Sequence, residues 1–265
     1  MAIYDLFGKN KSDEVYKKSV IESINHRGYR TVAPENTLPA YILSKKMGFD
    51  YVETDIGKTS DGVFVLLHNA SIDGTSNGTG QIANMTFEQV RQYDFGARSG
   101  NEYIGTKIPS LDEFLELCRN IALHPYLELK NTTTFTQEDI DKIVSMVEDY
   151  GMRGNVTYIS FSVEHLEKVK NADPSARLCY LQATYTSDVL TVCRNLKTDA
   201  NEVFYECSYT NLTQEICDIL RANHIPVGVY TVNSKEALRL LPKYVTKVTS
   251  DNLIASKVFY EDVMG

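Results

Sequence analysis

Residues 51–68, YVETDIGKTSDGVFVLLH, decide how the rest of this chain is organised. They predict two strands joined by a tight turn, because Asp61-Gly62 is a preferred pair for two-residue hairpin loops. Such a turn would place Asp55 opposite His68. Glu53 lies two residues before Asp55 and therefore shares its face of the strand. The hairpin thus gathers two carboxylates and an imidazole, although the solvated face of a surface hairpin would carry similar residues.

The composition is that of a globular protein with a large core: 265 residues, 43% hydrophobic and 23% charged. A formal net charge of −8 argues against nucleic acid or an anionic membrane as a partner. Five scattered cysteines without C-x-x-C spacing predict reduced thiols rather than disulfides or a zinc site. No run is apolar enough to span a bilayer, and the N-terminus lacks a signal-peptide core. We expect a cytoplasmic protein without stable membrane insertion, although a removed signal peptide would leave the same sequence.

Strands alternate with helices along the whole chain. Hydrophobic periodicity and helix-capping signals predict strands that start near residues 21, 51, 126, 155, 176, 203, 226 and 247. Eight such β units interleaved with helices indicate an α/β fold, a closed (β/α)8 TIM barrel. We expect residues 1–20 to form an N-terminal arm and residues 21–265 to form a single barrel domain. Within it, residues 69–110 are expected to form a small polar insertion after the hairpin.

Charged residues gather where the first three predicted strands end, which is the catalytic face of such barrels. Adjacent strands lie roughly 4.8 Å apart, so Glu53, Asp55 and Glu128 would come within reach of one ligand. Carboxylates packed this closely repel one another unless a cation lies among them. All-oxygen ligation suits one divalent ion, Mg²⁺ or Ca²⁺, rather than zinc. His26 and His68 would flank that ion, which suits acid–base displacement at a metal-bound phosphate.

These residues belong to a series of motifs that resembles the signature of glycerophosphodiester phosphodiesterases. The resemblance covers residues 22 to about 252, and all the motifs occur in order. They are H-R-G (26–28), P-E-N-T (34–37), E-x-D (53–55), the D-G turn, His68, N-G-T-G (77–80), I-P-S-L-D-E-F-L (108–115), L-E-L-K (127–130), I-S-F-S (159–162) and T-V-N (231–233).

The resemblance implies a TIM barrel with a small insertion and a reaction of lipid and glycerol metabolism, hydrolysis of glycerophosphodiesters to glycerol 3-phosphate and an alcohol. It also implies that the neighbouring glycerol hydroxyl attacks first and gives a cyclic phosphate that water opens. The site that it implies consists of His26 and His68 as general acid and base, Glu53, Asp55 and Glu128 as metal ligands, and Arg27 and Lys130 as phosphate-binding residues.

Two positions depart from the family pattern. Asn69 stands where an Asp usually follows the second histidine, and Tyr230 stands where a Trp often precedes T-V-N. Tyr230 would keep an aromatic wall beside the substrate, which makes it a candidate substrate-binding residue. Asn69 leaves open a weakened binding protein for glycerophosphodiesters. A third hypothesis is phospholipase-D-like activity on lysophospholipid or sphingolipid head groups, which the polar 69–110 segment disfavours. The sequence does not predict the alcohol, the metal, the oligomeric state or which histidine is the base.

Overall fold

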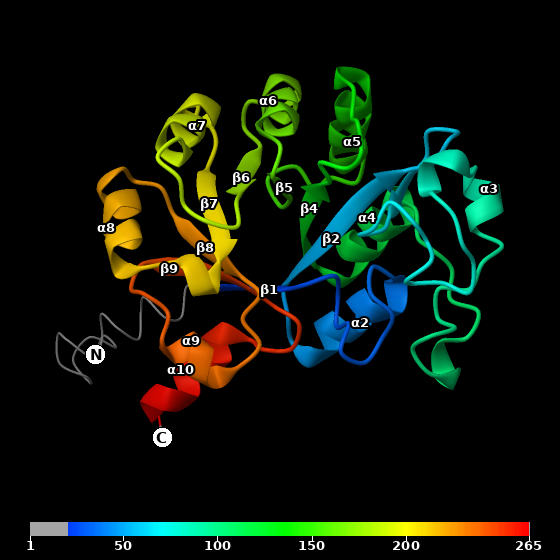
Figure 1. Cartoon of the computed structure of the whole chain (residues 1–265), viewed down its shortest axis with the longest axis horizontal. Coiled ribbons are helices and arrows are strands. Elements are labelled where there is room, and N and C mark those ends of the chain that lie inside the picture. Colours follow the sequence, from blue (N-terminus) through cyan, green and yellow to red (C-terminus); the bar gives the residue numbers. More distant parts are fainter. Residues whose placement is uncertain (1–20, 265) are drawn as a thin grey trace.

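Parallel strands close into a barrel at the centre of the computed structural model, which describes residues 21–264 (Figure 1). Strand β1 pairs with both β2 and β9, so the barrel closes between its first and last strands. Within the described residues the barrel strands, in spatial order, are β1 (Glu22–Asn25), β2 (Tyr51–Lys58), β4 (His124–Leu129), β5 (Thr157–Ser160), β6 (Arg177–Leu181), β7 (Val203–Ser208), β8 (Val227–Tyr230) and β9 (Val245–Ser250). The predicted eight-unit barrel is therefore confirmed, while the predicted arm of residues 1–20 lies outside the described residues.

Helices surround these strands, as Figure 1 shows for α5 to α8 along one side of the barrel. The helices are α2 (Leu38–Met47), α3 (Phe87–Val90), α4 (Leu111–Ile121), α5 (Gln137–Asp149), α6 (Val163–Ala172), α7 (Val189–Leu196), α8 (Gln214–Ala222), α9 (Lys235–Arg239) and α10 (Ala255–Met264), with 3₁₀ turns at Ile82–Asn84, Asn101–Tyr103 and Tyr209–Asn211. Within residues 21–264, no helix is both long and apolar enough to cross a lipid bilayer.

The predicted helix starts are set by side chains that cap the first turn. Thr86 and Ser110 form complete capping boxes at α3 and α4, each with the residue three positions later. Thr37 does not cap α2 through its side chain. It occupies the N-cap position of α2, but its hydroxyl donates to the Pro34 carbonyl and makes no cap bond. This helix is bounded instead by Pro39 in its first turn and by the left-handed Gly48 at its end.

Strand β4 shows how alternation separates the two layers of the core. Leu127 and Leu129 face outward and pack with the helices, while Tyr126 joins a cluster inside the barrel. Glu128 lies on the same face as Tyr126, close to the carboxyl end of β4. Each fully buried leucine contributes about 1.5–3 kcal/mol to folding. The outward leucines therefore stabilise the barrel and commit Glu128 to its interior, as the sequence predicts.

The hairpin forms, but its register differs from the prediction. Strand β3 (Phe64–Leu66) pairs antiparallel with β2, and the Leu67 amide donates to the Asp55 carbonyl at 3.0 Å. Leu67, not His68, therefore lies opposite Asp55. The reason is a three-residue loop, in which Gly62 has φ +83° and the Thr59 hydroxyl bonds both the Asp61 carboxylate and the Val63 amide. A turn followed by a left-handed glycine belongs to the three-residue class of hairpins.

Residues 69–110 leave the barrel after the hairpin and share an apolar cluster with it. Figure 1 shows the α3 segment at one side of the molecule. Its end returns to the hairpin, where the Leu66 amide donates to the Pro109 carbonyl at 3.1 Å. The segment therefore rests on the hairpin that carries His68. The cluster consists of Val65, Leu67, Ile72, Ile82, Val90, Phe95 and Ile108.

Candidate active site

The chain turns sharply where β1 ends, and this turn sets the first wall of the site. Arg27 and Gly28 have positive φ values of 57° and 78°. A Cβ on Gly28 would lie 2.7 Å from the Cβ of Ala40, so only glycine lets this loop pack on α2. The left-handed conformation of Arg27 turns its amide toward Glu53, and the amide donates to Glu53 Oε2 at 2.9 Å.

The three predicted metal ligands meet at the carboxyl ends of β2 and β4. Glu53, Asp55 and Glu128 are buried, and each offers an oxygen within 4.8 Å of the others. Asp55 and Glu128 are direct neighbours in the strand register. Glu53 Oε1 has no hydrogen-bond partner among the described residues. Buried carboxylate oxygens are rarely left unpaired. The donor set is therefore of the kind that a hard divalent cation requires.

The electrostatic state of this triad is uneven. Burial raises the pKa of Glu53 well above its usual range, and the charges of Asp55 and Glu128 raise it further. Burial and Asp55 raise the pKa of Glu128 to about 7. Burial also acts to raise the pKa of Asp55, but Lys130 and Arg27 outweigh it and hold that pKa below its usual range. Asp55 is therefore the carboxylate that stays ionised most readily.

The two predicted phosphate-binding cations lie against the triad. Lys130 Nζ is 2.8 Å from Glu128 Oε1 and 3.3 Å from Asp55 Oδ1. Arg27 Nε is 3.3 Å from Asp55 Oδ2, and its Nη1 is 3.1 Å from Glu35 Oε1. Burial acts to lower the pKa of Lys130, but Asp55 and Glu128 raise it above its usual range. Both cations are thus held charged at the edge of the acidic cluster.

Asn36 orients the Asp55 carboxylate by a hydrogen bond, a role that the sequence did not predict. Its amide nitrogen donates to Asp55 Oδ2 at 2.9 Å. Its oxygen accepts from the hydroxyls of Thr54 and Tyr41, both at 3.0 Å. The only sequence signal for Asn36 is its place in the P-E-N-T motif, which does not indicate a contact with Asp55. A buried amide whose hydrogen bonds are filled from both β2 and α2 holds the carboxylate in one orientation.

Both predicted histidines use the same ring nitrogen for support. His26 Nδ1 lies 2.8 Å from Asp251 Oδ1, and His68 Nδ1 lies 2.9 Å from Asn69 Oδ1. An ionised carboxylate and an amide oxygen only accept, so each ring carries its proton on Nδ1 and leaves Nε2 for other partners. Burial lowers the pKa of His68, and Arg27 and Lys130 add to this against the charge of Asp55. Asp251 was not predicted from the sequence.

Tyr230 ends β8 and contributes a ring rather than a hydroxyl. Its hydroxyl donates to the Gln182 carbonyl at 3.0 Å. The ring lies edge-on to Phe161, with 6.3 Å between centroids. Burial raises the pKa of Tyr230, so the hydroxyl stays neutral. Tyr230 and Phe161 therefore form an apolar wall at the carboxyl ends of β8 and β5.

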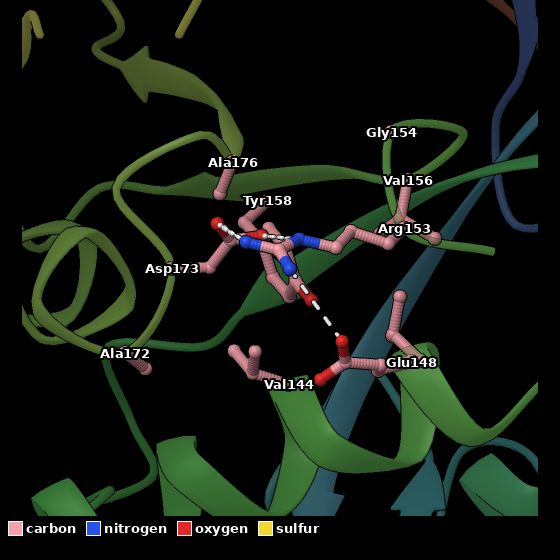
Figure 2. A pocket seen from close by; sticks show the side chains of 10 residues that line it. Val144, Glu148, Arg153, Gly154, Val156, Tyr158, Ala172, Asp173 and Ala176 are labelled. Atoms are coloured by element: carbon pink, nitrogen blue, oxygen red, sulfur yellow. Dashed lines mark hydrogen bonds and ion pairs between the residues drawn. The ribbon is translucent and has the colours of Figure 1, made fainter. Parts of the chain in front are cut away.

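A small cavity elsewhere in the fold does not compete with this site. It has a volume of about 70 Å³ and lies among residues that precede β5 and β6, at the opposite end of the barrel. Figure 2 shows Arg153 reaching across it between Asp173 and Glu148. Arg153 makes two hydrogen bonds with Asp173, at 2.9 and 3.2 Å. The Arg153 cation is therefore already paired with a carboxylate. A role in stabilising the fold explains its position better than ligand binding does.

Comparison with known proteins adds a family and a set of relatives. The model of the glycerophosphoryl diester phosphodiesterase family matches residues 26–254. A glycerophosphodiester phosphodiesterase of Caldanaerobacter subterraneus subsp. tengcongensis is 26% identical over 230 residues, which cover 86% of this chain and 93% of that protein. Another, from Bacillus subtilis, is 27% identical over 248 residues, which cover 86% and 82%. The solved structure of an Oleispira antarctica phosphodiesterase in complex with the product sn-glycerol-3-phosphate has the same fold, with a TM-score of 0.76, 22% identity and coverage of 94% and 98%.

Proposed function

The chain belongs to the glycerophosphoryl diester phosphodiesterase family and is a phosphodiesterase, and from this premise we propose that it hydrolyses glycerophosphodiesters to glycerol 3-phosphate and an alcohol by metal-assisted histidine catalysis. One observation carries the proposal. A buried triad of carboxylates, in which one Glu53 oxygen has no hydrogen-bond partner among the described residues, is bonded by the amide of Arg27, the residue after His26, and acts electrostatically on His68. Both imidazoles are supported through Nδ1.

The metal part of the proposal assigns one divalent ion, Mg²⁺ or Ca²⁺, to Glu53, Asp55 and Glu128. Oxygen-only ligands favour these hard cations over zinc. A Glu53 oxygen without a partner among the described residues, and a Glu53 pKa raised by burial and by two neighbouring carboxylates, both support a cation-binding role for this site. When bound, the ion would withdraw negative charge from the phosphate oxygens and so favour attack at phosphorus.

The histidines supply proton transfer. The Nε2 of one neutral ring takes the proton of the attacking hydroxyl, while the protonated Nε2 of the other gives a proton to the leaving alkoxide. The new phosphorus–oxygen bond forms as the bond to the alcohol breaks, so His26 and His68 end the step with exchanged protonation states. Nδ1 bonds to Asp251 and Asn69 support this assignment because they occupy Nδ1 on each ring, so that Nε2 is the nitrogen that would exchange protons with the substrate.

Arg27 and Lys130 would bind the phosphate, and Tyr230 would contact the carbon skeleton of the substrate. Arg27 has donors in a planar fork suited to phosphate oxygens, and Lys130 acts as a point charge. The Tyr230 hydroxyl is engaged by the Gln182 carbonyl, so the ring face is what the substrate would meet. A small glycerophosphodiester is supported as substrate by the Oleispira antarctica relative, whose structure holds sn-glycerol-3-phosphate.

The test is release of glycerol 3-phosphate from glycerophosphocholine and glycerophosphoethanolamine, with added Mg²⁺ or Ca²⁺ and with EDTA. We expect release that EDTA abolishes and that His68→Ala lowers roughly 10²–10⁴-fold. His224→Asn, at an exposed histidine, is the matched control and should leave the rate unchanged. Release that persists in EDTA would contradict the metal assignment. Failure to turn over either diester, with binding retained, would contradict the activity and favour a binding protein.

A further inference from the structure

Asp251, which follows the last barrel strand, contacts His26 in the candidate site. Asp251 follows β9, and its Oδ1 lies 2.8 Å from Nδ1 of His26, which follows β1. Its other oxygen, Oδ2, accepts from Asn233 Nδ2 at 2.7 Å. The Asp251 amide in turn donates to Asn233 Oδ1 at 2.9 Å. The carboxylate is therefore held on both oxygens, with the imidazole on one side and an amide on the other.

Barrel closure produces this contact. In the β1–β9 register, Asn25 lies beside Ser250, so the next residues of the two strands, His26 and Asp251, leave the barrel together. The His26 amide donates to the Ser250 carbonyl at 3.0 Å, which fixes the start of the turn. The ring position of His26 thus depends on two residues more than 200 positions away in the sequence.

Asp251 is present as a carboxylate. Burial acts to raise its pKa, but the bond to His26, together with Asn233 and Arg30, holds the pKa below its usual range. A carboxylate accepts and does not donate, so the 2.8 Å contact with Asp251 favours a proton on Nδ1 of His26 over the longer contact, 3.5 Å, from Arg30 Nη1 to the same nitrogen. A charged partner of this kind distinguishes His26 from His68, whose partner Asn69 is a neutral amide.

We propose that Asp251, clamped by Asn233, is a positioning residue that holds His26 with its proton on Nδ1 and its Nε2 toward the phosphate. The proposal rests on the proposed function and deepens it, because it assigns the T-V-N motif and the end of β9 to the support of one catalytic imidazole. A purely structural tie between β1 and β9 is already present in Asn25, whose Nδ2 donates to the carbonyls of Ser250 and Asp251 at 2.9 and 3.1 Å.

The experiment compares Asp251→Ala, Asp251→Asn and Asn233→Ala with Asn25→Ala as the structural control. Asp251→Ala should lower kcat roughly 10²-fold, the scale of loss for a misplaced catalytic group, with KM unchanged. Asp251→Asn should lose less, because its amide oxygen can still accept from Nδ1. Formate, a small carboxylate, should restore part of the kcat of Asp251→Ala. Asn25→Ala should lower the unfolding temperature and reduce kcat less than Asp251→Ala does, and formate should not restore its kcat.

A second readout does not need turnover. Long-range ¹H–¹⁵N spectra report which ring nitrogen carries the proton, and His26 should be Nδ1–H in the unmodified protein and lose this preference in Asp251→Ala. An unchanged tautomer, or kcat losses equal in Asp251→Ala and Asn25→Ala without formate rescue, would overturn the proposal. If the unmodified protein turned over no diester, the proposed function would fail, while the tautomer measurement would still decide the role of Asp251.

Discussion

The Asn69 side-chain oxygen accepts a hydrogen bond from Nδ1 of His68, its neighbour in the chain, at 2.9 Å. An amide therefore fills the place where the family pattern usually has a carboxylate. It orients the ring as a carboxylate would, but it adds no negative charge. Burial also lowers the pKa of His68, which favours its neutral form.

The substitution Asn69→Asp tests this relationship. A carboxylate on Nδ1 stabilises the imidazolium, so the pKa of His68 should rise by about one unit. The limb of the kcat/KM pH profile that His68 controls should move to higher pH by the same amount, while the other limb stays in place. Profiles that coincide for the two proteins would show that Asn69 does not set the protonation of His68.

How much of this could be predicted from the sequence depends on distance along the chain. The barrel and the acidic triad were predictable, because Leu127 and Leu129 alternate with charged residues and every strand is followed by a helix signal. The hairpin register was not, because the side chain of Thr59 selects a three-residue loop that the Asp-Gly pair alone does not indicate. Asp251 was missed because only barrel closure brings it to His26.

Without an ion, the triad should cost stability that a neutral isostere recovers. Glu128→Gln removes one buried charge beside Asp55, so the unfolding temperature of the metal-free protein at pH 8 should rise by about 2–4 °C. Added Mg²⁺ or Ca²⁺ should stabilise the unmodified protein more than the variant. Differential scanning calorimetry with and without EDTA measures both effects.

The matched control for that experiment is Glu138→Gln, at a side chain exposed on α5. It removes only an exposed ion pair with Lys142, which contributes little, so the metal-free unfolding temperature should change by less than about 1 °C and the response to the ion should stay the same. A Glu128→Gln protein that is less stable in EDTA, or that responds to the ion as the unmodified protein does, would contradict a shared cation.

The same charges predict a pH dependence of the metal-free protein. Glu128 and Glu206 both have folded-state pKa values raised by burial to about 7, and that of Glu53 is raised too. The folded state therefore binds more protons than the unfolded state, so stability should fall as pH rises from about 5 to about 8. His68 and His165, whose pKa values are lowered by burial, have the opposite sign but are two groups against three. Unfolding temperatures in EDTA that rise across this range would contradict the assignment, and a saturating ion should flatten the curve.

Asn36 should matter for both folding and metal binding. Asn36→Ala removes the partner of Asp55, Thr54 and Tyr41 in a buried position, which should lower the free energy of unfolding by about 1–3 kcal/mol. Because Asp55 would lose its fixed orientation, the affinity for the divalent ion should fall as well. Urea denaturation and calorimetric ion titration measure the two effects. A loss of stability without a change in ion affinity would mean that Asn36 supports only the loop.

A crystal structure of the protein grown with a divalent salt and glycerol 3-phosphate tests the central claim most directly. We expect one ion bound by Glu53, Asp55 and Glu128 together, with the phosphate touching that ion and lying between the Nε2 atoms of His26 and His68. An ion bound elsewhere, carboxylates that do not share it, or a phosphate beyond the reach of both imidazoles would contradict this account.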